Sequence, residues 1–139
     1  MATATSVKMT ATQAQQLWAA ASAAARKAFD NARPTPMVVG TPTTPLGSDI
    51  DYTKQTYFVP DGVCGFGWLT IRPARGALVT YLKSKGIGYN GYYGGWQVGA
   101  HSLGVPSSQS YERNYAAACA AAEVLRAAGV QAFGEGRLD

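Results

Sequence analysis

The sequence is poor in the residue types from which catalytic and metal sites are usually built. Its 139 residues include one histidine, His101, and two cysteines, Cys64 and Cys119. A single imidazole excludes any site that needs two histidines, and the two distant thiols have neither the spacing of a zinc site nor that of a disulfide framework. We therefore expect no catalytic residues, no bound metal and no cofactor.

Long apolar runs are also missing. No stretch of about 18 apolar residues occurs, and the Met1–Lys8 start has neither the basic end nor the apolar run of a secretory signal. The sequence therefore predicts no membrane contact and a product that stays in the cytosol where it is made. That reducing compartment suits free thiols.

Acidic residues are absent between Asp61 and Glu112, although charged residues make up 14% of the whole chain. The cations of this window are Arg72, Arg75, Lys83 and Lys85, and many of the aromatic residues lie there too. Such a segment favours an anionic or aromatic partner over a cationic one. The net charge of +4 is too small to favour non-specific binding to duplex DNA.

The N-terminal part is predicted to be one helix followed by an extended arm. Thr10 and Gln13 have the spacing of a capping box at the start of an amphipathic helix, Ala11–Asn31. Its apolar stripe comprises Leu17, Trp18, Ala21, Ala25, Ala28 and Phe29. Residues 1–33 thus form a helical segment. Residues 34–60 hold five of the seven prolines and form an arm, in which Met37–Val39 and Thr56–Val59 are candidate edge strands.

Residues 61–139 are predicted to form a compact unit. In order, we expect a strand Gly65–Arg72, a helix beginning at Pro73, a loop Gly86–Gly95, a strand Trp96–Ala100, a helix capped by Ser108 or Ser110, and a closing strand from Val130. This order predicts the α/β class, as a strand-helix-strand-helix-strand two-layer sandwich preceded by the amphipathic helix and the Pro-rich arm.

The strand Gly65–Arg72 has two different faces, because side chains alternate along a strand. One face carries Gly67, Leu69 and Ile71, and the other carries Phe66, Trp68, Thr70 and Arg72. The first face is apolar and predicts core. The second fits either a stacking platform for a ligand or a sheet face beneath a helix, and the sequence leaves both interpretations open.

The segment Cys64–Ile71 resembles the first RNA-binding signature of the RRM family. Gly65, Phe66 and Gly67 match, and Trp68 and Leu69 match in kind; Cys64 and Ile71 depart where a basic and an aromatic residue are expected. The resemblance implies bases stacked on Phe66 and Trp68. The partner signature, expected upstream by one helix and two strands, is missing.

Two further motifs have simpler explanations. Gly86, Gly88 and Gly91 match the dinucleotide fingerprint, but they follow a predicted helix and lead into a strand, the reverse of the order that a phosphate site needs. Cys64 with His101 as its base would make a thiol nucleophile. A small, half-buried cysteine before a glycine-rich strand is the simpler interpretation of Cys64.

Much of the chain, from about Thr35 to the C terminus, is similar to small uncharacterised proteins encoded in tailed-bacteriophage genomes. The residues that carry the similarity are Val59–Trp68, Tyr92–Gly95 and Ala132–Asp139. The resemblance implies a viral origin and expression in the bacterial host cytoplasm. It leaves open whether the product enters the virion, and it brings no catalytic residues.

These observations predict a non-enzymatic phage binding or assembly module that forms homo-oligomers through its N-terminal half. Its aromatic and basic surface around residues 86–95 would take an anionic or aromatic ligand or a protein partner. The expected binding residues are Phe66, Trp68, Arg72, Arg75, Tyr92, Tyr93 and Trp96. The alternatives are a protein that binds single-stranded nucleic acid and a Cys64-dependent enzyme. If Leu17 and Trp18 cover Phe66 and Trp68, the platform is core and the nucleic-acid alternative fails.

Overall fold

The computed structural model describes residues 8–139 and has a mixed α/β fold, as predicted. Three α-helices are present in the described chain: α1 (Ala11–Asn31), α2 (Ala77–Ser84) and α3 (Tyr111–Ala127). One antiparallel sheet pairs β1 (Met37–Val39) with β2 (Tyr57–Val59). The other has the order β4 (Tyr89–Asn90), β5 (Trp96–Gly99), β3 (Gly65–Ile71) and β6 (Ala132–Leu138). A 3-10 turn, Ala100–Ser102, follows β5.

The larger sheet has a ferredoxin-like topology. From β3 to β6 the elements follow the order β-α-β-β-α-β, all neighbouring strands are antiparallel, and β3 and β5 occupy the centre. Trp68 of β3 lies opposite Gly99 of β5 on one side and opposite Glu135 of β6 on the other. The strand with the predicted two-faced pattern is therefore a central strand.

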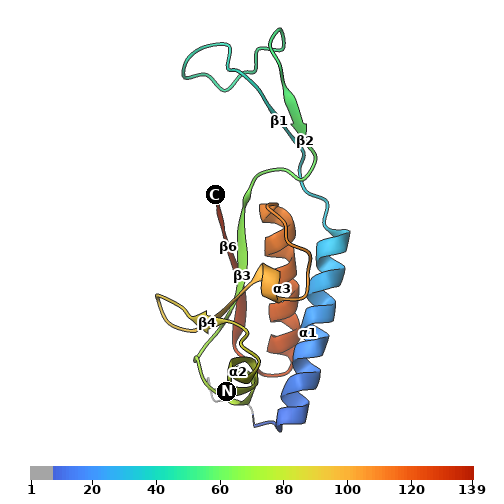
Figure 1. Ribbon diagram of the computed structural model, residues 1–139, viewed down its shortest axis with the longest axis vertical. Helices are drawn as coiled ribbons and strands as arrows, with labels where there is room; N and C mark the ends of the chain where they lie inside the picture. The colour runs from blue at the N-terminus through green and yellow to red at the C-terminus, as the bar shows by residue number, and fades with distance from the viewer. Residues whose placement is uncertain (1–7) are drawn as a thin grey trace.

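The helices lie on one side of this sheet. Helix α3 packs against β3 and β6, and α1 packs on the far side of α3, so that α3 lies between the sheet and α1 (Figure 1). Helix α2 lies near the beginning of α1. Among residues 8–139, no helix covers the opposite face of the sheet.

Glycine and alanine allow this close layering. A Cβ added to Gly67 would lie 2.5 Å from the carbonyl oxygen of Asn114, and one added to Gly134 would lie 2.7 Å from the main-chain nitrogen of Cys119. The buried small residues of the two helices are Ala14, Ala21 and Ala25 of α1 and Ala117, Ala118, Ala121 and Ala122 of α3. Small residues therefore let α3 lie close to the sheet and line the packed helices.

The first helix is found as predicted. Thr10 Oγ1 accepts a hydrogen bond from the Gln13 N–H, and Gln13 Oε1 accepts one from the Thr10 N–H, which completes the capping box. Trp18 and Phe29 of the predicted stripe are buried against the same chain. Within this chain the stripe therefore packs on α3, and association through the N-terminal half stays a prediction.

Several expectations about the compact unit need correction. Strand β3 ends at Ile71 and not at Arg72, and β6 begins at Ala132 and not at Val130. Helix α2 begins at Ala77 and not at Pro73, because Gly76 takes a φ of 111° immediately before it. The loop Gly86–Gly95 contains a short strand, β4, which the predicted order omitted. Strand β5 ends at Gly99, where the 3-10 turn begins. The cap of α3 is Ser110, whose Oγ accepts from the Arg113 N–H at 3.3 Å.

The arm is a β-hairpin that projects from the body (Figure 1). The side chains of Val38, Val39, Tyr57 and Phe58 are exposed on it. At its root the Thr35 N–H donates to Glu112 Oε2 at 2.6 Å. Arg113 binds the Phe29 carbonyl at 2.8 Å and Asp61 at 3.2 Å, so the N-terminal end of α3 fixes both ends of the arm. No helix of the described chain is long and apolar enough to cross a bilayer.

Candidate binding surface on the open sheet face

The sheet face that points away from α3 is called the open face here. It carries one set of alternating side chains from each long strand: Phe66, Trp68 and Thr70 of β3, Gln97 of β5, and Phe133, Glu135 and Arg137 of β6. The strand register places these residues side by side, because directly paired residues share a face. Leu17 and Trp18 lie in α1, on the far side of α3, and therefore do not pack over Phe66 and Trp68.

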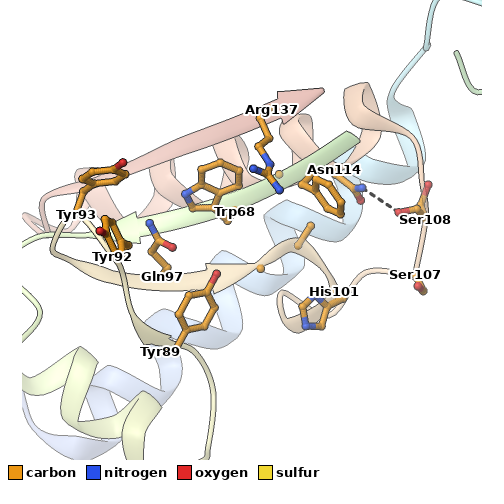
Figure 2. Close-up of a pocket in the computed structure, with 14 residues that line it drawn as sticks. Trp68, Tyr89, Tyr92, Tyr93, Gln97, His101, Ser107, Ser108, Asn114 and Arg137 are labelled. Carbon is orange, nitrogen blue, oxygen red and sulfur yellow. Dashed lines mark hydrogen bonds between the residues drawn. The ribbon is translucent and has the colours of Figure 1, made fainter. Parts of the chain in front are cut away.

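An open cleft of about 680 Å³ follows this face. Figure 2 shows Trp68 and Arg137 in its middle, Tyr92 and Tyr93 at one end, and His101, Ser107 and Ser108 at the other. The lining also includes Phe66, Tyr89, Gln97 and Asn114. The cleft thus joins an aromatic end to a polar end across two central strands.

Phe66 and Arg137 are two exposed neighbours on the open face. Phe66 is 48% exposed, and the guanidinium carbon of Arg137 lies 5.3 Å from the centroid of its ring. The register places the two residues directly opposite each other on β3 and β6. A guanidinium held over a ring offers a flat, cationic surface, on which a further planar group can stack.

Trp68 provides a hydrogen-bond donor without an acceptor. Its indole nitrogen is buried and has no hydrogen-bond partner in the described chain, although the residue as a whole is half-buried. A buried donor that stays unpaired costs free energy, on the order of 1–3 kcal/mol. An acceptor supplied by a ligand in the cleft would remove that cost.

The polar end of the cleft is held in place by Asn114. Its side chain is buried, and Nδ2 donates to the Gly65 carbonyl at 3.2 Å and to the Ser108 carbonyl at 3.0 Å. These bonds tie the segment before α3 to the start of β3. His101 is exposed on the 3-10 turn beside Gly99. Because the main chain is fixed at this end of the cleft and polar side chains are exposed there, this end is suited to hydrogen bonding with the edge of a planar ligand.

The loop Gly91–Gly95, called the tyrosine loop below, forms the aromatic end of the cleft. The Gly91 N–H donates to the Gly95 carbonyl at 2.9 Å, which shapes a tight turn. Tyr92 and Tyr93 are 91% and 87% exposed, and their rings meet edge to face with centroids 4.8 Å apart. The exposure of both tyrosines is as predicted; their contact with a partner stays a prediction.

The cleft is cationic in its formal charge. Its lining residues, all in the described chain, include Arg137 and no carboxylate. Glu135 lies on the open face outside the lining, where its Oε1 accepts from the Thr70 hydroxyl. Arg72 is exposed at the end of β3, next to Gly95.

The structure brings together four of the expected binding residues: Phe66, Trp68, Tyr92 and Tyr93. Arg72 and Arg75 are exposed but do not line the cleft. The expectation that Trp96 belongs to the binding surface was wrong, because Trp96 lies on the covered face of β5 and is 7% exposed. Its indole N–H donates to the Ile87 carbonyl at 3.1 Å, and Lys83 lies over its ring. The adjacent residue, Gln97, faces the cleft instead.

Several lining residues were not found from the sequence: Arg137, Gln97, His101, Ser108 and Asn114. For Arg137 a signal existed, since the alternation of Gly134 and Gly136 with Glu135 and Arg137 gives β6 one small and one charged face. No comparable pattern marks Asn114 or His101.

The other sequence motifs are not assembled into sites. Cys64 is exposed outside the cleft and donates from Sγ to Gln109 Oε1 at 3.9 Å, whereas His101 lines the cleft; no hydrogen bond joins the two in residues 8–139. The glycines of the dinucleotide pattern follow α2 and lead into β4 and β5, as expected for a chance match. The RRM-like segment lies on a central strand, but β5, the other central strand, presents Gln97 and not an aromatic pair.

Comparisons with protein-family models, with curated proteins and with solved structures find no match to this chain. The bacteriophage resemblance therefore stays an expectation from the sequence. The candidate surface rests on the geometry alone.

Proposed function

We propose that this protein is a non-enzymatic binding module that holds single-stranded nucleic acid on its open sheet face. The observation that carries the proposal is that no helix of the described chain covers this face: α1 packs on α3, so that Phe66 stays exposed and Trp68 half-buried on the open face. A sheet face that served only as core would need a second layer over its aromatic residues.

The chemistry of the face fits bases better than it fits a purely apolar ligand. Every base has a flat face that can stack on Phe66, on Trp68 or on the Arg137 guanidinium, and each stacked base contributes about 1–3 kcal/mol. Base edges carry hydrogen-bond acceptors, and the buried Trp68 N–H has none within residues 8–139. Gln97 and His101 offer further hydrogen bonds along the same cleft.

The charge of the cleft agrees with a phosphate-bearing chain. Arg137 is present in the lining, carboxylates are absent from it, and Arg72 lies near the tyrosine loop. With so few cations, stacking contributes more than phosphate contacts do. Binding should therefore fall only shallowly with salt, because each phosphate contact adds about 0.7 to the slope for a single strand.

Fluorescence anisotropy with a labelled oligothymidylate tests the proposal. Phe66→Ala should weaken binding about 5-fold to 150-fold, which corresponds to the loss of one stacked base. The matched control is Phe58→Ala, which removes an equally large exposed ring from the arm, far from the cleft. Equal losses in the two variants, no binding by the unaltered protein, or tighter binding of duplex than of single strand would each contradict the proposal.

The bacteriophage origin is also proposed, on the sequence resemblance alone. A module of this kind would act in the cytoplasm of the bacterial host, where single strands are exposed during genome replication and transcription.

A further inference from the structure

Strand β6 is an edge of the larger sheet with an uncovered outer side. Its sole neighbour in the sheet is β3. The Asp139 N–H bonds to the Cys64 carbonyl and the Arg72 N–H to the Gln131 carbonyl, so the odd-numbered residues of this segment bond inward to β3. Since main-chain groups alternate in direction along a strand, those of the even-numbered residues point outward.

The outward groups are available for pairing. The Ala132 carbonyl is taken by Arg126 Nη1 at 2.8 Å. The outward N–H and C=O groups of Gly134, Gly136 and Leu138 have no main-chain partner in residues 8–139. This edge has no proline, lysine or bulge, which are among the devices that prevent a sheet edge from pairing with another chain, and its two charged side chains, Glu135 and Arg137, have opposite signs.

We propose that two copies of this chain associate by antiparallel pairing of β6 with β6, with Gly136 opposite Gly136 of the second copy. Gly134 and Leu138 then lie opposite each other and exchange main-chain hydrogen bonds, as the Gly136 residues do. In this pairing every outward main-chain N–H and C=O group from Gly134 to Leu138 has a hydrogen-bond partner. The two sheets become one continuous sheet of twice the width.

Charge complementarity selects this register among those that match outward groups with outward groups. With Gly136 at the centre, Glu135 of each copy lies opposite Arg137 of the other, in the closely spaced, non-hydrogen-bonded position. A shift of the centre to Glu135 places Glu135 opposite itself, and a shift to Arg137 places Arg137 opposite itself. Both shifts put like charges directly opposite, which is destabilising.

The apolar side chains at the ends of β6 agree with the same register. Leu138 is 60% exposed and would lie opposite Gly134 of the second copy, beside Cys119 of that copy's α3, against which Gly134 packs. The two-fold axis is perpendicular to the sheet, so both open faces lie on the same side. The dimer would present a doubled surface, although the pairing itself does not depend on what the open face binds.

Charge exchange across the interface tests the proposal, with the full chain and no ligand, by analytical ultracentrifugation. The unaltered protein should be a dimer. Glu135→Arg and Arg137→Glu should each raise the dimer dissociation constant by about tenfold or more, because each places like charges opposite in both pairs. An equimolar mixture of the two variants should form a heterodimer with opposite charges restored, and the double variant should dimerise again.

The mixture separates an interface effect from a folding defect, since two misfolded variants would not restore each other. Tyr57→Ser on the arm is the control and should leave the dimer unchanged. A monomeric protein at high micromolar concentration, single variants that dimerise as the unaltered protein does, a mixture that fails to associate, or a dimer lost with Tyr57→Ser would overturn the proposal. Dimerisation without nucleic-acid binding would leave it standing and would count against the proposed function alone.

Discussion

Gly67 of β3 lies directly against the main chain of Asn114 in α3, so that a Cβ added at Gly67 would lie 2.5 Å from the Asn114 carbonyl oxygen. The contact sets the distance between the sheet and its covering helix. It also places the Asn114 side chain where it binds the Gly65 and Ser108 carbonyls at the polar end of the cleft. One small residue thus serves both the packing of the layers and the shape of the open face.

Gly67→Ala should therefore lower the free energy of unfolding by about 1–3 kcal/mol, because the neighbour of the new Cβ is main chain that has little freedom to move. Urea unfolding measures the change. Gly40→Ala is the matched control, since a Cβ there meets side-chain atoms of Ile50 and Thr56 in the arm. Equal free energies of unfolding for the two variants would show that the close contact between Gly67 and α3 does not contribute to stability.

Arg113 should contribute far more to stability than a surface arginine does. It binds the Phe29 carbonyl at 2.8 Å, pairs with Asp61 and lies over the Phe29 ring. Arg113→Ala should lower the free energy of unfolding by about 2 kcal/mol. Arg26→Ala, which removes an exposed helix pair with Asp30, should cost less than about 0.5 kcal/mol. Thermal or urea unfolding with similar losses in both variants would disprove the role assigned to Arg113.

Replacing both Tyr92 and Tyr93 by Ala should weaken binding of an oligothymidylate and leave the melting temperature nearly unchanged. The rings are almost fully exposed, so their removal costs little packing, but they line the aromatic end of the cleft. Calorimetry and an anisotropy titration give the two quantities. A large fall in melting temperature would assign the tyrosines to the core, and unchanged affinity would remove them from the site.

Local patterns predicted the elements whose signals lie within one segment. The capping box at Thr10 and the apolar stripe of Ala11–Asn31 specify a helix without reference to the rest of the chain, and α1 has those bounds. The alternation in Gly65–Arg72 likewise identified both faces of β3. The expected strand begins at the first residue of β3, Gly65, and ends one residue beyond its last residue, Ile71.

Contacts between distant segments could not be predicted. Whether Phe66 and Trp68 are covered depends on where α1 packs, and that is decided by alanines of α3 that lie far away in the sequence. Trp96 was expected at the binding surface, but the sequence does not determine the register of its strand. A shift of one residue exchanges the faces of a strand, so Gln97 lies in the cleft and Trp96 in the core.

The residues of the candidate surface were predicted only in part, for the same reason. Phe66 and Trp68 share a strand, so their common face was visible from the sequence. Arg137 joins them through the pairing of β6 with β3, and Asn114 and His101 through a helix and a turn, which no local pattern connects.

The most direct test of the proposed function uses the indole N–H signals of the three tryptophans in a two-dimensional ¹H–¹⁵N spectrum. Trp68 lies on the open face and its buried Nε1 has no partner in residues 8–139, Trp96 Nε1 donates to the Ile87 carbonyl, and Trp18 is buried in α1. Titration with a single-stranded oligonucleotide should shift the Trp68 signal and leave those of Trp18 and Trp96 in place. A Trp68 signal that stays fixed at saturating oligonucleotide, or a shift confined to Trp18 or Trp96, would contradict binding at the open face.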